Sequence, residues 1–490
     1  MRRAQLEPLD MHPQSLNGQT HEIDQRESAR TVSGGRGLLC FILGLFGVLP
    51  LIVLTPPFQV PDEPQHFLRA YQLSELQLTA SMYEGEPRPI WPASLEAKAM
   101  LPSSLIELSE SFLGTRSIHS KRPIRPQPLQ DTFSALDRPL DPDRRELLSL
   151  QTVAKAPPSY LAQAGAIAVG RWLGAGPLLL LYLGRLANSL VAVATLAWAV
   201  RLMPIGREMA MLFGLLPMAT YLYASMSADA TVITTAFLFT AVALRGQLRG
   251  DWTRGEVALA VISGVVFCIQ KPVYAPLLLI GLPAILKRER AKHIILVHVA
   301  IVATVLGASV AWMYFSYPMW SVPKGGSVAG QLNFTAADPL RFLGMLVADF
   351  FHSRFYYDSA VGVLGWMTLG LPRLGYVLPL CGFALATLAH RRNGLTLTAP
   401  AIVWNVLLLA GASVLTVMGA RTGIGSTTMD GFQGRYLIPL LALVAATWCS
   451  AVRVPVSRWV SRAALPLLVA VIVAEYIVTD LTIVTAYHVF

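Results

Sequence analysis

Charged residues are scarce in this sequence. Only 14% of the 490 residues are Asp, Glu, Lys or Arg, whereas a soluble globular domain carries about 25%. Hydrophobic residues make up 54% and occur in long continuous runs. A bilayer can be crossed only by helices or a closed barrel, because the backbone must satisfy its polar groups internally. Since the runs do not alternate, the sequence predicts an all-α polytopic membrane protein.

Cysteine is also rare, with four residues in the whole chain. Each cysteine falls within an apolar run, far from the others: Cys40, Cys268, Cys381 and Cys449. This spacing does not match metal-ligand patterns and favours small buried hydrophobic side chains. The N-terminal segment 1–36 is polar and mixed in charge. It is too long and too acidic for the start of a cleavable signal peptide, so we expect a disordered cytoplasmic tail.

Apolar runs in the sequence predict eleven spans. Two of them, 256–270 and 272–287, are short for a bilayer of about 30 Å. They either tilt against their neighbours or form one broken unit. The eleven predicted spans are 37–55, 177–200, 208–224, 228–246, 256–270, 272–287, 293–315, 374–391, 397–418, 435–452 and 463–484.

The net charge of +10 resides largely in short loops between these spans. Such an excess of Lys and Arg is typical of the cytoplasmic side of a membrane protein, and it does not indicate nucleic-acid binding. With the N-terminus inside, eleven spans place every basic loop inside and the C-terminus outside. The basic loops are 201–207, 245–255, 287–292, 391–396 and 453–462.

An extra span at 157–173 would move every later basic loop to the outside. We therefore interpret that segment as an interfacial or re-entrant helix on the outer face. Segment 316–373 mixes apolar stretches with charged residues, a pattern typical of helices at the membrane surface. The predicted organisation is a tail 1–36, a first span 37–55, an outer loop 56–176 with short interfacial helices, spans two to seven in 177–315, a second outer loop 316–373 with interfacial helices, and spans eight to eleven in 374–490.

The most distinctive local pattern follows the first span, in the segment PPFQVPDEPQHF (56–67). Pro64 can begin a helix, so Asp62 or Glu63 would cap a helix of about 64–77 at the outer surface. His66 and Arg69 follow at spacings that place them near the face of Asp62. One interpretation is a capped surface helix. The other is a fixed carboxylate that removes a proton from a hydroxyl, or an Asp-Glu pair that binds a divalent cation.

A second pattern, GFQGRY (431–436), lies at the outer end of the tenth predicted span. Its glycines allow close backbone approach, and the guanidinium of Arg435 is well matched to phosphate. Snorkelling of Arg435 to the interface is the alternative. Ionisable residues within or near spans are functional candidates or polar helix contacts, and they include Arg185, Asp229 and Lys271.

Five short motifs in this order resemble a widespread family of bacterial membrane proteins, the domain of unknown function 2142 family. The motifs are PPFQVPDEPQHFLRAYQ, SMSAD (225–229), KPVY (271–274), VGVLGW (361–366) and GFQGRY. More broadly, the layout resembles the GT-C glycosyltransferase superfamily, in which an acidic motif in the first outer loop precedes a Pro-Pro helix and a span with an arginine. The segment KAPP (155–158) and Arg185 are similar to that pattern.

The resemblance implies a GT-C-like bundle with a large first periplasmic loop in the bacterial inner membrane. It implies transfer of a sugar from a polyprenyl-phosphate donor to a glycan, lipid or protein acceptor of the cell envelope. It assigns catalysis to Asp62 with Glu63, and donor phosphate binding to Arg435 and, less directly, Lys271. The requirement for a divalent cation, Mg²⁺ or Mn²⁺, varies among such enzymes. Asp62 and Glu63 are its candidate ligands here. The supporting residues are His66, Arg69, Arg185, Asp229 and Tyr436.

Two other functions use the same charges. A transporter or flippase of lipid-linked saccharide predicts ionisable residues that join into a route near the bilayer midplane. A non-catalytic component of a polysaccharide assembly complex predicts that these charges can be replaced without effect. Clustering of the charges at one face favours the enzyme. That interpretation requires Asp62 and Arg435, about 370 residues apart in the chain, to meet at one place.

Overall fold

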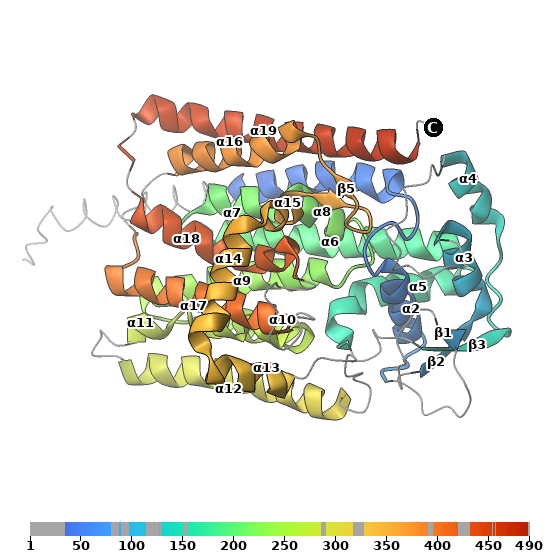
Figure 1. Cartoon of the computed structure of the whole chain (residues 1–490), viewed down its shortest axis with the longest axis horizontal. Helices are drawn as coiled ribbons and strands as arrows, with labels where there is room; N and C mark the ends of the chain where they lie inside the picture. Colours follow the sequence, from blue (N-terminus) through green and yellow to red (C-terminus); the bar gives the residue numbers. More distant parts are fainter. Residues whose placement is uncertain are drawn as a thin grey trace, which may run out of the picture.

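The computed structural model shows a bundle of helices that run roughly parallel to one another, with a smaller mixed region at one end (Figure 1). The structure describes residues 35–79, 88–89, 98–113, 127, 129–149, 155–285, 291–316, 328–390, 395–419, 432–452, 454–455 and 457–488. The predicted tail 1–36 therefore lies outside the described residues, except for its last two positions, which begin the first helix.

The described residues of each of the eleven predicted spans are mostly helical, which confirms the all-α polytopic class. Six helices are long and apolar enough to cross a membrane: Gly35–Leu54, Pro177–Leu202 (α6), Asp229–Arg249 (α9), His293–Ser316 within α12 (Ala291–Ser316), Gly434–Ala451 (η6 and α18) and Trp459–Tyr487 within α19 (Arg458–Tyr487). The remaining five predicted spans correspond to Arg254–Gln270 (α10), Arg373–Ala389 (α16), Ala399–Gly419 (α17) and the two broken spans described next.

Prolines break two of the predicted spans. The span predicted at 208–224 consists of α7 (Arg207–Gly214) and α8 (Pro217–Tyr223). Pro217 stands at the start of α8, where a missing N–H costs nothing. The span predicted at 272–287 begins as a 3₁₀ helix, η4 (Pro272–Leu279), and continues as α11 (Leu282–Ile285). Pro276 lies inside η4 and removes a donor that a regular α-helix would use.

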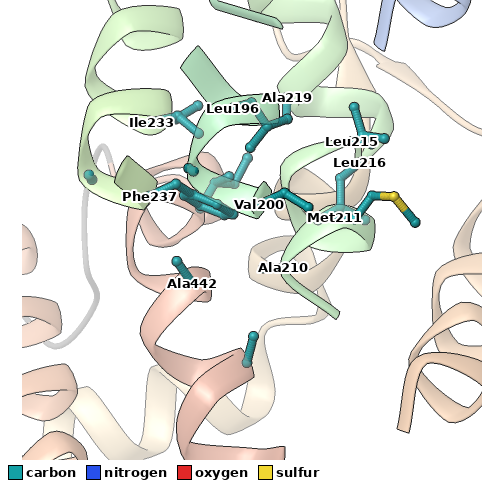
Figure 2. Close-up of a cluster of buried hydrophobic side chains, with 14 of the residues drawn as sticks. Leu196, Val200, Ala210, Met211, Leu215, Leu216, Ala219, Ile233, Phe237 and Ala442 are labelled. Atoms are coloured by element: carbon teal, nitrogen blue, oxygen red, sulfur yellow. The ribbon is translucent and has the colours of Figure 1, made fainter. Parts of the chain in front are cut away.

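Buried apolar side chains from α6, α7, α8, α9 and α18 pack together inside the bundle (Figure 2). Leu196 and Val200 of α6 lie near Phe237 of α9 and Ala442 of α18, with Met211 of α7 close by. The packing leaves little spare room, because a Cβ added at Gly214 would lie 2.4 Å from a methyl group of Leu196. This tight core fixes α6, α9 and α18 relative to one another.

The first large loop folds into a separate layer at one end of the bundle (Figure 1). It contains α2 (Glu63–Ser74), α3 (Ser103–Leu113), α4 (Leu129–Ser134) and a three-stranded sheet of order β1 (Arg88–Pro89), β3 (Arg145–Ser149), β2 (Lys98–Pro102). Strand β3 pairs antiparallel with β2 and parallel with β1. The sequence predicted the short helices and missed the sheet.

The chain returns to this layer through η3 (Pro157–Tyr160) and α5 (Leu161–Trp172). With 12 residues, α5 extends about 18 Å and is too short to cross a bilayer. The end of α19 also reaches this layer, because the amide of Gln127 donates to the carbonyl of Tyr487 at 2.7 Å. We call this end of the bundle the loop end.

Basic residues collect at the opposite end of the bundle, where the first helix begins. Arg36 contacts Glu208 at 3.0 Å, and a carbonyl at the end of α6 accepts from Arg245. Arg245 and Arg249 both contact Glu256 at the start of α10. The first helix therefore runs from this basic end to the loop end, as the predicted arrangement of spans requires.

The segment predicted to hold surface helices contains α13 (Val328–Ala337), α14 (Pro339–His352) and α15 (Arg354–Val361). In Figure 1, α14 crosses the direction of the bundle. Phe342 and Met345 of α14 are buried against Tyr356 and Phe432. The stretch beyond α15 is a small hairpin of β4 (Val363–Leu364) and β5 (Leu369–Gly370), where a surface helix was predicted.

Leu76 gives a test of the local structure after α2. It adopts a left-handed backbone conformation with φ 61°, and its side chain is 85% exposed. Such a conformation costs a non-glycine residue about 1–2 kcal/mol, and little burial offsets it here. We expect Leu76→Gly to raise the free energy of unfolding by about 1 kcal/mol, measured by thermal unfolding in detergent. Leu78→Gly, at a residue outside the left-handed region, should give no gain; an equal gain at both positions would contradict the explanation.

Candidate active site

A buried ion pair organises the loop that follows the first helix. Glu63 and Arg185 are both fully buried, and Nη2 and Nε of Arg185 donate to the two carboxylate oxygens at 2.6 and 2.8 Å. The same guanidinium donates to the carbonyls of Ile52, Thr55 and Pro56. Glu63 also accepts from the backbone amides of Phe58 and Met226. Glu63 thus ties the loop to α6 through Arg185 and to the segment before α9 through Met226, and its bond to Phe58 closes the loop on itself.

Asp62 is oriented differently from its neighbour. It precedes α2 in a left-handed conformation with φ 63° and makes no side-chain cap to the helix. Asp tolerates this conformation better than most residues. Its side chain is 46% exposed, and Oδ2 lies 3.7 Å from Nη2 of Arg435, whose side chain is 5% exposed. Asp62 therefore presents a carboxylate at the surface of the loop end, beside a buried cation.

A second, shorter ion pair lies in the same region. Nζ of Lys271, between α10 and η4, is 2.7 Å from Oδ1 of Asp229 at the start of α9. The ring of Tyr436 links the two pairs, because Lys271 lies 4.7 Å and Arg435 5.4 Å from its centroid. The hydroxyl of Tyr274 donates to the carbonyl of Tyr436 at 2.7 Å, which fixes the start of η6 (Gly434–Leu440) against η4.

Lys155 is the residue that sequence analysis missed. Burial lowers its pKa, Asp229 and Asp62 act in the opposite direction, and Lys271 and Arg435 lower it further. Lys155 is therefore within electrostatic reach of both ion pairs. Lys155 belongs to the segment KAPP, whose prolines indicate the start of a helix, and the pattern does not distinguish the lysine from a solvated surface residue. We call Asp62, Lys155, Asp229, Lys271 and Arg435 the charged cluster.

Residues of α2 support the charged cluster from one side. The carbonyl of Lys155 accepts from Nη2 of Arg69 at 3.1 Å. Nδ1 of His66 lies 2.7 Å from the hydroxyl of Tyr160. Burial and the charge of Lys155 hold the pKa of His66 well below its ordinary value, although Asp229 acts in the opposite direction. The imidazole is consequently neutral, and it is suited to hydrogen bonding rather than to pairing with an anion.

The VGVLGW segment closes the loop of Asp62 from another side. Nε1 of Trp366 donates to the carbonyl of Phe58 at 3.1 Å. The hydroxyl of Tyr221 donates to the carbonyl of Gln59 and accepts from the amide of Gly365. The VGVLGW motif and Tyr221 of α8 thus hold the backbone just before Asp62, although all three segments are far apart in the sequence.

Gly434 brings Arg435 to its place. Its amide donates to Oγ of Ser359 at 2.8 Å, and a Cβ at this position would lie 1.8 Å from the carbonyl oxygen of Tyr356. Gly431, the other glycine of the motif, lies outside the described residues. The close contact between α15 and η6 therefore requires glycine at 434.

Gly434→Ala should force α15 and η6 apart. We expect a loss of about 1–3 kcal/mol in the free energy of unfolding, because the clash is with backbone atoms that cannot rotate away. Thermal unfolding in detergent measures this loss. Gly411→Ala in α17 is the matched control, since no atom lies within 4 Å of the added carbon. Equal stability of Gly434→Ala and the parent protein would contradict the packing described.

The charges of the cluster favour an anion. The cluster contains three cations and two carboxylates, and Nε of Arg435 has no hydrogen-bond partner among the described residues. A guanidinium with two ammonium groups nearby is well suited to a phosphate group. A divalent cation does not fit at Asp62 and Glu63, because both oxygens of Glu63 accept from Arg185 and Asp62 faces Arg435. The described residues also contain no group of three or more His, Cys, Asp or Glu arranged for a metal.

The fold and the charged cluster define a polytopic helical membrane protein with a partly buried, anion-favouring site at one end of its bundle. The chain belongs to the DUF2142 family, described as predicted membrane proteins, whose profile matches residues 45–444. This match confirms the family resemblance drawn from the five motifs. No curated protein and no solved structure matches the chain.

Proposed function

We propose that this protein is a GT-C-type glycosyltransferase that moves a sugar from a polyprenyl-phosphate donor to a hydroxyl of a cell-envelope acceptor. The observation that carries the proposal is the meeting of Asp62 and Arg435 at 3.7 Å, with Lys155 and Lys271 nearby. A carboxylate that can accept a proton thus lies beside cations that can bind a phosphate. These are the two parts that a direct displacement at a sugar phosphate needs.

In the proposed reaction, Asp62 removes the proton of the acceptor hydroxyl. The acceptor oxygen forms a bond to the anomeric carbon of the sugar as the bond from that carbon to the donor phosphate oxygen breaks. The electron pair of the broken bond stays on the polyprenyl phosphate, which gains negative charge. Arg435, Lys155 and Lys271 stabilise that charge. A single displacement of this kind inverts the anomeric configuration.

The other predicted residues take positioning roles in this proposal. Glu63 and Arg185 hold the loop that orients Asp62, and Arg69 holds the backbone of Lys155. Asp229 holds Lys271, and Tyr436 lies against both Lys271 and Arg435. The role of Glu63 is thus proposed as structural, which differs from the catalytic or metal-binding role that the resemblance implied.

We also propose that the loop end faces the periplasm of a bacterium and that the basic end faces the cytoplasm. The support is the cluster of Arg36, Arg245 and Arg249 at the end where the first helix begins. An excess of basic residues in short loops is typical of the cytoplasmic side. The donor would then present its headgroup at the outer leaflet, where the charged cluster lies.

Reconstitution tests the proposed function. The purified protein is placed in liposomes with a polyprenyl phosphate that carries a radiolabelled sugar and with an envelope extract as acceptor. We expect label to leave the carrier, and we expect Lys155→Met to lower the rate at limiting donor at least about tenfold, since a charge-assisted contact contributes about 1.5–3 kcal/mol. Label that stays on the carrier but changes leaflet would support the flippase. No loss of label and no movement would support the non-catalytic component.

A further inference from the structure

The side-chain amide of Gln270 is a neutral polar group at the edge of the charged cluster. Gln270 is the last residue of α10 and directly precedes Lys271, whose ammonium group belongs to the cluster. Its side chain is buried, with 9% exposed. The amide lies beside the hydroxyl of Tyr160, which in turn contacts His66. Gln270, Tyr160 and His66 thus form a row of groups that can hydrogen-bond but carry no charge.

The Gln270 amide is incompletely paired. Neither its oxygen nor its nitrogen has a hydrogen-bond partner of regular geometry among the described residues. A buried amide whose donors and acceptor are not all satisfied is unfavourable, and such groups are rare in folded proteins. The amide offers two donor hydrogens and one acceptor oxygen, so it matches a ligand group that both donates and accepts. Sugar hydroxyls have this property, whereas phosphate oxygens only accept.

We propose that Gln270 recognises hydroxyl groups of the sugar on the donor, and that it determines donor specificity. This inference rests on the proposed function and adds the location of the sugar. The cations of the cluster account for the phosphate and Asp62 for the acceptor proton, which leaves the sugar without an assigned partner. An uncharged, polyhydroxylated ring fits the neutral row of Gln270, Tyr160 and His66. A site built to hydrogen-bond hydroxyls discriminates strongly against ligands that lack them.

Binding affinity separates recognition of the sugar from recognition of the phosphate. The full-length protein carrying Asp62→Asn, which should not consume the donor, is measured in detergent. The probes are polyprenyl phosphates that carry glucose, galactose, mannose, N-acetylglucosamine or arabinose. The reference is polyprenyl methyl phosphate, a diester of the same charge without a sugar. We expect at least one glycosylated donor to bind more tightly than the reference.

Gln270→Met removes the amide and keeps the length of the side chain. We expect it to weaken the preferred glycosylated donor about 5- to 150-fold, because a hydrogen-bonded hydroxyl would lose its partner, and to leave the affinity for the reference unchanged. Arg435→Gln should weaken both probes equally. Gln163→Met, which removes a buried glutamine bonded to Asn188 at 2.9 Å, should change neither affinity.

The outcomes distinguish the inference from the proposed function. Equal losses for both probes with Gln270→Met would show that Gln270 only supports the structure and would overturn the inference. No change with Gln270→Met, or no preference of the parent protein for any glycosylated probe, would also overturn it. In each of these three cases, an affinity for the reference that depends on Arg435 would still support the proposed phosphate site. Binding of no probe at all would contradict the proposed function and the inference together.

Discussion

Asp62→Asn is expected to lower the rate constant of sugar transfer about 10²–10⁴-fold, which is the contribution typical of a general base. Asparagine tolerates the left-handed backbone of position 62 as aspartate does, so the loop should keep its shape. The buried contacts of Glu63 and Arg185 do not involve the Asp62 side chain. We therefore expect an unchanged unfolding temperature and retained donor affinity. Single-turnover transfer of a labelled sugar, at saturating donor, measures the effect.

Asp141→Asn is the control for this prediction. Asp141 is an exposed carboxylate of the same loop layer, and Oδ1 accepts from the amide of Arg144. Its substitution should leave transfer within about twofold of the parent rate, because solvent screens the charge of an exposed carboxylate. A rate near that of the parent protein for Asp62→Asn would remove Asp62 from the role of base.

Arg185→Met is expected to destabilise the protein by about 3–5 kcal/mol, the cost of breaking a buried ion pair by removing one partner. The substitution leaves the Glu63 carboxylate buried without its cation and three carbonyls without their donor. Adding Glu63→Gln to Arg185→Met should recover part of this loss, because a neutral amide is easier to bury than a carboxylate. Thermal unfolding of the two single variants and the double variant measures the coupling.

The exposed pair of Arg144 and Glu107 is the matched control. Its nitrogen and oxygen are 2.8 Å apart, but the two side chains are 63% and 48% exposed. Arg144→Met should change stability by less than about 1 kcal/mol, as for other surface ion pairs. If Arg185→Met were no more costly than Arg144→Met, or if the double variant were less stable than Arg185→Met alone, Glu63 and Arg185 would not organise the loop as described.

The helical class could be predicted because hydrophobicity alone specifies it. Runs such as 177–200 and 463–484 are long, apolar and almost free of charge, and both are helices in the structure. The breaks at Pro217 and within η4 were harder to predict, because apolar composition is the same on both sides of them. The sheet of the loop layer was missed because β1 has two residues and β2 and β3 five each, too few to show a pattern.

The candidate site was predictable where charge stood out against an apolar background. Arg185, Asp229, Lys271 and Arg435 are conspicuous in or beside spans, and the structure brings each of them into an ion pair. The pairing itself could not be read from the sequence, because Asp62 and Glu63 are adjacent and look equivalent. Asp62 has a left-handed backbone just before α2 and Glu63 is the first residue of that helix, so the Glu63 carboxylate is buried against Arg185 while that of Asp62 meets Arg435.

Lys155 was not singled out because it lies in a charged, proline-rich loop, where a lysine carries no signal of its own. Its position near the cluster depends on tertiary structure, in which Arg69 binds its carbonyl and Asp62 and Asp229 influence its charge. Gln270 was missed for a related reason. A glutamine at the end of an apolar helix is unremarkable in sequence, and its significance depends on burial and on its incompletely paired amide.

The most direct measurement of the central claim is a structure of the protein with a polyprenyl phosphate that carries a non-transferable sugar analogue, determined by cryo-electron microscopy. The account predicts the phosphate within hydrogen-bond distance of Arg435 and Lys155, and the anomeric carbon facing Asp62. A phosphate bound away from the charged cluster, or an Asp62 carboxylate that does not face the sugar, would contradict it.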